Sequence, residues 1–196
     1  MFTGIVQATS SVMRVSPGAL EVAIPSALRG ALRVGGSIAV DGVCLTVRHL
    51  GERSFVADVS SETARRTALA HRPVGTGVNL ELPVPAGGGL DGHWVLGHVD
   101  AVGRLRALVR ERSGWTLVVS FPPPDGRYVV DKGSVTVDGV SLTPFGVTAG
   151  EFRCAVIPET YEKTTLRERR PGDPVNLEYD VLAKYVERMM RDVSAD

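Results

Sequence analysis

The amino-acid sequence predicts an all-β protein: two homologous Greek-key antiparallel β-barrels in tandem, with short helices and a C-terminal oligomerisation helix. Three observations lead to this prediction: an internal repeat, the strand-forming composition of each copy, and a helical hydrophobic pattern near the C-terminus. We expect the N-terminal barrel to span residues 1–88, the C-terminal barrel residues 89–179, and the helix residues 180–196.

The repeat relates two copies of one sequence pattern at an offset of 97 residues. Residues 38–47 read Ile-Ala-Val-Asp-Gly-Val-Cys-Leu-Thr-Val and residues 135–144 read Val-Thr-Val-Asp-Gly-Val-Ser-Leu-Thr-Pro, with six of the ten positions identical. The same offset relates the Val-Asn-Leu-Glu of 78–81 to that of 175–178. Near the N-terminus the offset falls to 93, so the second copy needs about four additional residues. Landmarks that recur in unchanged order indicate a duplicated domain.

Each copy has the composition of a small β-barrel. The runs 37–47, 54–59 and 115–121 are rich in β-branched and aromatic residues, and Pro-Gly, Gly-Gly and Asp-Gly pairs punctuate the copies. About half a dozen short strands in about 85 residues favour a closed barrel, because closure removes the sheet edges. We expect short helices at 61–70 and 158–169, each with a glutamate in its first turn.

The C-terminal segment follows a different hydrophobic period. A glycine-rich linker, Pro85–Gly89, separates the copies, and a helical pattern begins after the second copy ends. The helix could pack on its own barrel. We favour an oligomerisation helix because the segment lies outside both repeats. Its apolar stripe comprises Val181, Leu182, Tyr185, Val186, Met189, Met190 and Val193, and its charged face comprises Lys184, Glu187, Arg188 and Arg191.

The composition argues against several classes of protein. Lys plus Arg and Asp plus Glu both total 22, and aromatic residues make up only 6%. A single-strand nucleic-acid module would show a basic excess and aromatic stacking residues, so that interpretation is weak. Cys44 and Cys154 are too few for a disulfide framework and fit a reducing cytoplasm. The N-terminus has no signal-peptide pattern, and no apolar run reaches the length of a membrane span.

Five motifs, in order, resemble the riboflavin synthase family over nearly the whole chain. They are Met1–Gln7, Asp41–Val47, Gly97–Asp100, Asp138–Thr143 and Ile157–Thr160. The resemblance implies that two molecules of 6,7-dimethyl-8-ribityllumazine become riboflavin and 5-amino-6-ribitylaminouracil by transfer of four carbons, the last step of riboflavin biosynthesis. It implies no metal, nucleotide or redox cofactor. It also implies a homotrimer held by the C-terminal helix, with association with lumazine synthase left open.

A duplicated barrel suits this chemistry, because two molecules of the same compound react, one as donor and one as acceptor. The two copies differ where reactive groups are expected, since Cys44 aligns with Ser141 and Ile5 aligns with His98. The resemblance implies that Cys44 and His98 are catalytic in the first pocket, and Ser141 and Asp138 in the second. His98 would move protons near neutral pH, and Ser141 or an activated water would add to a ring carbon.

The substrate-binding positions fall in equivalent segments of the two copies. The set comprises Gly4, Ile5, Val6, Cys44, Leu45, Thr46, Asp58, Val59, Ser60, Ser61, Glu62, Thr63, Gly97, His98, Val99, Lys132, Ser141, Leu142, Thr143, Ala155, Val156, Ile157, Pro158, Glu159 and Thr160. The resemblance implies that Lys132 reaches a polar edge of the substrate.

Each assignment has a structural alternative. Cys44 could be a small core residue, Asp138 part of a turn and Lys132 a solvated charge. The spacing of His93 and His98 lacks the cysteine and acidic partners of a zinc site.

The sequence also departs from the family pattern, and the departures keep a second function open. Trp94 and Leu96 stand where smaller or more polar residues are frequent, and Tyr161 replaces a leucine. On a strand, Trp94 and Leu96 would point to the same side as His98 and could narrow the first pocket. The alternative function is a non-catalytic lumazine- or flavin-binding protein for antenna or storage purposes. The retained Ser141 favours the enzyme.

Overall fold

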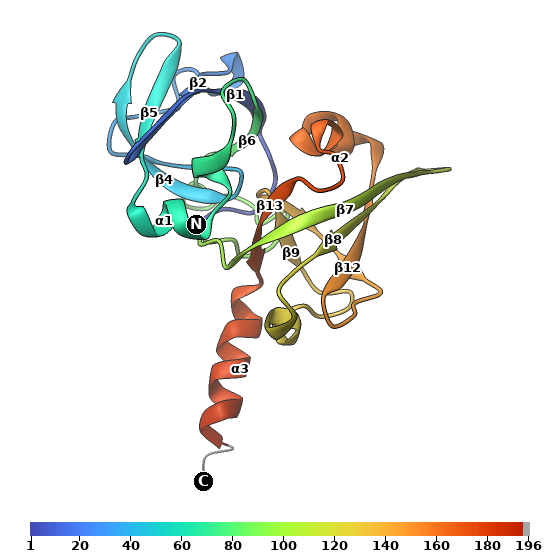
Figure 1. Cartoon of the computed structure of the whole chain (residues 1–196). Helices are drawn as coiled ribbons and strands as arrows, with labels where there is room; N and C mark the ends of the chain where they lie inside the picture. The colour runs from blue at the N-terminus through green and yellow to red at the C-terminus, as the bar shows by residue number, and fades with distance from the viewer. Residues whose placement is uncertain (194–196) are drawn as a thin grey trace.

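The computed structural model describes residues 1–193 of the chain, so residues 194–196 of the expected helix lie outside the described residues. The first barrel is closed, and its strands follow the order β1-β2-β5-β4-β3-β6, in which the last strand pairs with the first (Figure 1). This order is the Greek key that the sequence predicts. The strands are β1 (Ala8–Ser16), β2 (Ala19–Ala23), β3 (Ser37–Val40), β4 (Val43–Leu50), β5 (Ser54–Asp58) and β6 (Gly77–Glu81).

The second barrel repeats this arrangement with one strand broken in two. Its order is β10-β9-β13-β7-β8-β12-β11. Only Thr143 separates the two end strands in the chain, and together they occupy the place of β4. The break falls beside Pro144, which has no backbone N–H to donate to a ladder. The strands are β7 (Ala101–Glu111), β8 (Gly114–Ser120), β9 (Val135–Val137), β10 (Val140–Leu142), β11 (Pro144–Phe145), β12 (Glu151–Val156) and β13 (Pro174–Tyr179).

The two short helices are shorter than the sequence predicts. The prediction of single helices over 61–70 and 158–169 is wrong, because Thr67 and Thr164 take extended conformations and end each α-helix after six residues. Each threonine hydroxyl donates to the carbonyl four residues earlier, at 2.7 Å. The helical segments are η1 (Ser26–Leu28), α1 (Ser61–Arg66), η2 (Leu69–His71), η3 (Pro123–Tyr128), α2 (Pro158–Lys163), η4 (Thr165–Glu168) and α3 (Val181–Val193).

The additional residues of the second copy lengthen one hairpin. In the first barrel, Ser16 pairs with Ala19 around a Pro-Gly turn. The equivalent pair in the second barrel is Val109 with Thr116, but there the ladder continues to Glu111 and Gly114. The tip of β7 and β8 therefore projects from the barrel, as Figure 1 shows at the right.

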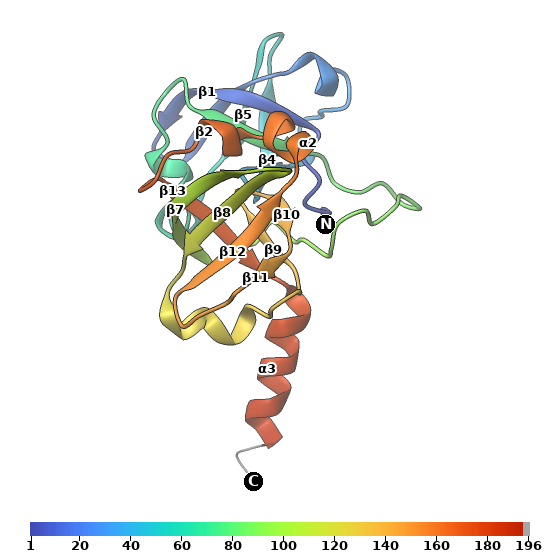
Figure 2. The ribbon, with the colours of Figure 1, turned by 90° about the vertical axis from the view of Figure 1, so that its right-hand side faces the viewer.

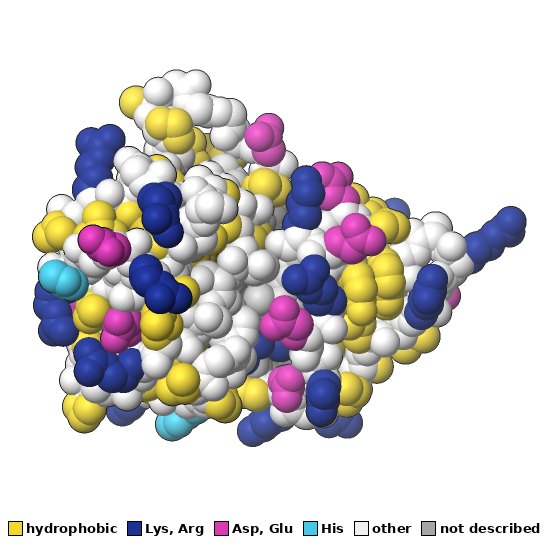
Figure 3. Space-filling model, turned by 90° about the horizontal axis from the view of Figure 1, so that it is seen from above, with side chains coloured by type: hydrophobic (Ala, Val, Ile, Leu, Met, Phe, Trp, Pro, Cys, Tyr) yellow, Lys and Arg dark blue, Asp and Glu magenta, His cyan; other side chains and the backbone are white. Residues whose placement is uncertain are grey.

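Each barrel has its own hydrophobic core. Leu20, Ile38, Phe55 and Leu80 are among the fully buried side chains of the first. The side chains of Leu105, Phe152, Leu177 and Tyr179 fill the second. On the face seen from above, cationic and anionic side chains are interspersed, and no basic stripe runs across that face (Figure 3).

A buried ionic cluster joins the barrels about an approximate two-fold axis. The carboxylates of Asp41 and Asp138 are fully buried, and each accepts from the guanidinium groups of both Arg72 and Arg169, at 2.9–3.1 Å. The four residues form two pairs related by the offset of 97, so each barrel contributes one aspartate and one arginine. Burial and the neighbouring Asp138 carboxylate raise the pKa of Asp41 to about 6, against the lowering effect of the two arginines.

Two asparagines extend this cluster reciprocally. Asn79 Nδ2 donates to the carbonyl of Asp138, and Asn176 Nδ2 donates to the carbonyl of Asp41, both at 2.9 Å. Asp41 and Asp138 have positive φ angles of 45° and 47°, and a glycine follows each one. These tight turns let the two Asp-Gly corners meet back to back. The barrels are therefore held in one fixed relation.

Helix α3 leaves the second barrel and projects away from it (Figures 1 and 2). Its first turns are tied to the barrel by Lys184, whose Nζ lies 2.7 Å from Asp100 Oδ1. The predicted apolar stripe is largely exposed: Tyr185 is 66% and Met189 68% exposed. The side chain of Val193 lies outside the described residues. Among the described helices, none has the length and apolar character to cross a membrane.

Candidate functional site

Two extended segments cross between the barrels and complete equivalent sites. The backbone N–H of Ser141 donates to the carbonyl of Gly4, and that of Cys44 donates to the carbonyl of Gly97, both at 2.8 Å. Both glycines have positive φ angles, +79° and +76°. A Cβ atom on either glycine would lie within 2.7 Å of the facing side chain. Only glycine fits here, so the segments that carry Ile5 and His98 are fixed beside Ser141 and Cys44, respectively.

Two buried glutamates hold these crossing segments in place. The carboxylate of Glu81 accepts from the backbone N–H of Thr3 at 2.6 Å and of Gly4 at 3.0 Å. In the other copy, Glu178 accepts from the N–H groups of Leu96 at 2.7 Å and Gly97 at 2.9 Å. Burial raises the pKa of both carboxyl groups. The Glu residues of the repeated Val-Asn-Leu-Glu motif are thus positioning residues for the two sites.

The site of the second barrel is a cavity of about 310 Å³ beside Ser141. The lining includes seven of the residues expected from the sequence: Gly4, Ile5, Val6, Ser141, Ile157, Glu159 and Thr160. Three further lining residues, Val140, Lys163 and Thr164, were not expected. Lys163 Nζ lies 2.6 Å from Glu159 Oε1, so a cation and an anion share the rim.

A histidine that the sequence suggested only as a metal ligand contacts the serine of this cavity. His93 Nδ1 lies 2.8 Å from Ser141 Oγ, and His93 is only 8% exposed. Burial lowers its pKa, partly offset by Asp180. The imidazole is therefore neutral near pH 7, and Nδ1 can accept the hydroxyl proton when Nε2 carries the ring proton. Such a pair can activate the hydroxyl as a nucleophile. Nε2 is buried and has no hydrogen-bond partner among the described residues.

The equivalent site of the first barrel lies beside Cys44 and the segment that carries His98. Cys44 is half-buried and His98 is exposed, with Gly97 packed against the cysteine. Trp94 is 48% exposed and Leu96 is half-buried, whereas the intervening Val95 is buried. The segment is not a continuous strand, because only Val95 pairs, with Phe2, and Gly97 has a positive φ of 76°. A common side for Trp94, Leu96 and His98 therefore stays a prediction.

Most of the remaining first-site candidates lie between the end of β5 and the first turn of α1, whereas Thr46 lies on β4. Ser60 caps the helix, since its Oγ accepts from the N–H of Thr63 at 3.0 Å. Thr46, Asp58 and Ser61 are exposed, as is Glu62, which is engaged by Arg65 and Arg66. Those two contacts lower the pKa of the Glu62 carboxyl. The equivalent Glu159 faces Lys163, so both sites carry an ion pair on their short helix.

Several expected site residues lie elsewhere. The side chains of Leu45, Val59, Leu142 and Val156 belong to the barrel cores. Lys132 is exposed with a φ of 61° and is not part of the cavity lining. Thr143, Ala155 and Pro158 are exposed but also fall outside the lining, and Val99 is half-buried.

Asp138 in particular does not reach the cavity. Its carboxylate is consumed by the inter-barrel cluster, where Arg72, Arg169 and the backbone N–H of Asn176 donate to it. The geometry gives its expected catalytic role no support, because a fully buried carboxylate with filled acceptor positions cannot contact a ligand in that cavity. The sequence signal for this structural role was the recurrence of an aspartate and a later arginine at the offset of 97, Asp41 with Arg72 and Asp138 with Arg169.

The fold and the reciprocal sites define a tandem-barrel protein with two related candidate sites. The sequence profile of the lumazine binding domain matches residues 3–83 and 96–180. The chain therefore belongs to the lumazine-binding family.

The relatives with similar sequences are named riboflavin synthases. The riboflavin synthase of Mycobacterium bovis is 44% identical over 200 residues, covering 97% of this chain and 98% of the relative. That of Photobacterium phosphoreum is 40% identical over 194 residues, covering 97% and 89%. The crystal structure of LumP complexed with riboflavin superposes with a TM-score of 0.85 at 21% identity, covering 91% of this chain and 99% of that one. This last similarity shows the shared fold.

Proposed function

We propose that the protein catalyses the riboflavin synthase reaction, the conversion of two 6,7-dimethyl-8-ribityllumazine molecules into riboflavin and 5-amino-6-ribitylaminouracil. The observation that carries the proposal is the reciprocal pair of sites. Each copy of the repeat supplies a crossing glycine segment to the other, Gly4 to Ser141 and Gly97 to Cys44. Two related sites suit a reaction in which one compound is both donor and acceptor.

The protein's main contribution in this proposal is to hold two substrates in register. Fixing both reactants makes the reaction effectively unimolecular, which supplies about 7–11 kcal/mol of the barrier in well-oriented cases. In the second site, His93 takes the hydroxyl proton as the Ser141 oxygen, or a water held by it, adds to a ring carbon. In the first site, Cys44 and His98 act on the partner substrate, with His98 as the proton carrier. Asp138 positions the barrels.

Substrate contacts are proposed for the residues that border the two sites. Thr46, the Asp58–Thr63 segment and Val99 border the first site in this proposal, and Thr143 and the Ala155–Thr160 segment border the second. Leu45, Val59, Leu142 and Val156 present only backbone groups, since their side chains are in the cores. Lys132 makes a contact only with a substrate that extends beyond the cavity of about 310 Å³.

The assembly proposed is a homotrimer held by α3, in which the first barrel of one subunit faces the second barrel of its neighbour. The support is the exposed apolar stripe on a helix that projects from the barrel, with Leu182 53%, Tyr185 66% and Val186 59% exposed. A solvent-facing stripe of this kind is typical of an association surface. The proposal retains the division of the chain into 1–88, 89–179 and 180–196. We also propose a cytoplasmic location, which two free thiols support, and association with lumazine synthase.

The competing function is a lumazine- or flavin-binding protein without catalysis. It is favoured by Trp94, a bulky and exposed side chain on the segment that carries His98. Incubation of the purified protein with the lumazine, without cofactor, separates the two. Riboflavin that accumulates over many turnovers supports the enzyme. Tight binding of the lumazine without riboflavin formation supports the binding protein.

A further inference from the structure

The two barrels differ at a position where one carries aromatic rings and the other does not. In the second barrel, Trp115 on β8 and Tyr161 on α2 stack with ring centroids 3.7 Å apart and planes 8° apart. The offset of 97 relates Tyr161 to Ala64 on α1. The equivalent helices α1 and α2 therefore differ at this position: α2 carries an aromatic ring and α1 a methyl group.

Strand register identifies the residue of the first barrel that is equivalent to Trp115. Trp115 pairs with Val156 across β8 and β12. In the first barrel the equivalent Val59 donates its N–H to the carbonyl of Gly18, at 3.0 Å. Gly18 therefore takes the place of Trp115. The aromatic pair of the second barrel is replaced in the first by a glycine and an alanine.

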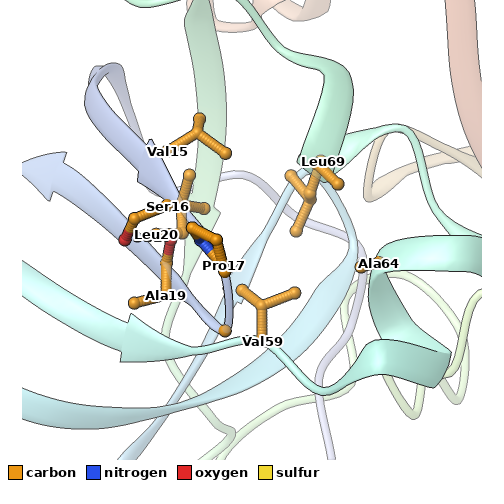
Figure 4. Close-up of a pocket in the computed structure, with 10 residues that line it drawn as sticks. Val15, Ser16, Pro17, Ala19, Leu20, Val59, Ala64 and Leu69 are labelled. Atoms are coloured by element: carbon orange, nitrogen blue, oxygen red, sulfur yellow. Dashed lines mark hydrogen bonds between the residues drawn. The ribbon is translucent and has the colours of Figure 1, made fainter.

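A cavity occupies the space that these two substitutions leave. Its volume is about 260 Å³, and its lining carries no charged side chain. Figure 4 shows Val15, Leu20, Val59 and Leu69 around it, with Ala64 at the helix. None of its lining residues belongs to the Ser141 cavity, so it is a separate place on the molecule.

We propose that this cavity is a binding site for a small, planar, uncharged aromatic molecule. The second barrel shows which chemistry this space accepts, because there it holds two parallel rings between equivalent walls. An aromatic ring buried among aliphatic side chains gains from the removal of apolar surface from water. A charged group would lose its hydration without a partner in the lining. The site goes beyond the proposed reaction and does not depend on it.

Indole, which has the two-ring size of a tryptophan side chain, is a suitable probe. Methyl-region NMR spectra of the full-length protein, titrated with indole, should show saturable shifts of Val15, Val59 and Leu69 with a Kd of about 1 mM or tighter. The matched charged probe, indole-5-carboxylate, should bind at least about ten-fold more weakly. Methyl groups of Val6, Val140 and Ile157 report the Ser141 cavity in the same spectra.

Two reciprocal variants test the equivalence of the barrels. Ala64→Tyr installs the ring of the second barrel and should abolish the shifts at Val15 and Val59. It should also raise the midpoint of thermal unfolding by about 2–6 °C. Tyr161→Ala opens the corresponding space beside Trp115 and should create a second indole site, detected as new shifts at Val156. Shifts in the wild type confined to Val6, Val140 and Ile157, or unchanged indole binding in Ala64→Tyr, would overturn the proposal.

Discussion

The imidazole Nδ1 of His93 lies 2.8 Å from the hydroxyl of Ser141, although 48 positions separate the two residues. The contact joins the segment between the linker and β7 to the cavity of the second barrel. If this pair activates the hydroxyl, Ser141→Ala and His93→Gln should each lower kcat by about 10²–10⁴-fold, the usual contribution of general-base catalysis. Steady-state riboflavin formation measures this. His71→Gln, which changes an exposed histidine, serves as the control and should leave kcat unchanged. Wild-type turnover in both variants would remove the pair from the mechanism.

The pH dependence of the reaction should reflect the lowered pKa of His93. Burial lowers the pKa of His93 from its ordinary value of 6.5. The neutral base therefore persists below pH 6.5, and the acid limb of kcat should lie below that value. The stability contribution has the same sign: it is complete above pH 6.5 and declines as the pH falls toward the folded-state pKa. An acid limb above pH 6.5, or one that is unchanged in His93→Gln, would contradict the assignment.

The ionic cluster between the barrels should be costly to break. The side chain of Arg169 is 3% exposed and serves both Asp41 and Asp138. Arg169→Met leaves two buried carboxylates with one cation, and we expect it to lower the free energy of unfolding by about 3–5 kcal/mol. The neighbouring Arg170 is exposed, so Arg170→Met should change it by no more than about 0.5 kcal/mol. Urea denaturation of both variants decides this, and equal effects would mean that the cluster does not bear on stability.

The positioning glutamates should act on opposite sites. Glu81→Gln loosens the Gly4 segment and should weaken lumazine binding beside Ser141 by about ten-fold, whereas Glu178→Gln should do so beside Cys44. NMR shifts from each barrel distinguish the sites. Because burial raises the pKa of Glu81 above 4.5, the folded protein binds this proton more tightly than the unfolded chain. Its contribution to stability therefore decreases as the pH rises from about 4.5 through the folded-state pKa. Identical effects of the two variants on both sites would contradict this division.

The exposed stripe on α3 should govern the oligomeric state. Met189 is 68% exposed, and Met189→Glu places a charge in the proposed interface. We expect the variant to sediment as a monomer under conditions where the wild type is a trimer. Arg112→Glu, at the turn between β7 and β8, is the control and should leave the trimer intact. A monomeric wild type would rule out the proposed trimer.

The repeat made most of the fold predictable. Because similar sequences adopt the same fold, the offset of 97 relates α1 at 61–66 to α2 at 158–163 residue for residue. The lengths of the helices were not predictable, because the hydroxyls of Thr67 and Thr164 turn back onto backbone carbonyls and end the helices early.

The candidate site was predictable in part, for a physical reason. Ser141 and Ile157 lie on motifs whose local sequence marks them, and both line the cavity. His93 and Asp138 depend on contacts between distant segments, and no local pattern determines these. The Asp138 turn was visible as an Asp-Gly pair, but the direction of its carboxylate follows from how the barrels meet.

Two equivalent substrates should react on one duplicated chain, and the stoichiometry of the products measures whether they do. Purified protein with 6,7-dimethyl-8-ribityllumazine, and no cofactor, should form one riboflavin and one 5-amino-6-ribitylaminouracil for every two lumazines consumed. Absorbance and chromatography quantify all three compounds in one time course. A ratio of one riboflavin per lumazine, or lumazine that binds and remains unchanged, would contradict a reaction between two equivalent substrates.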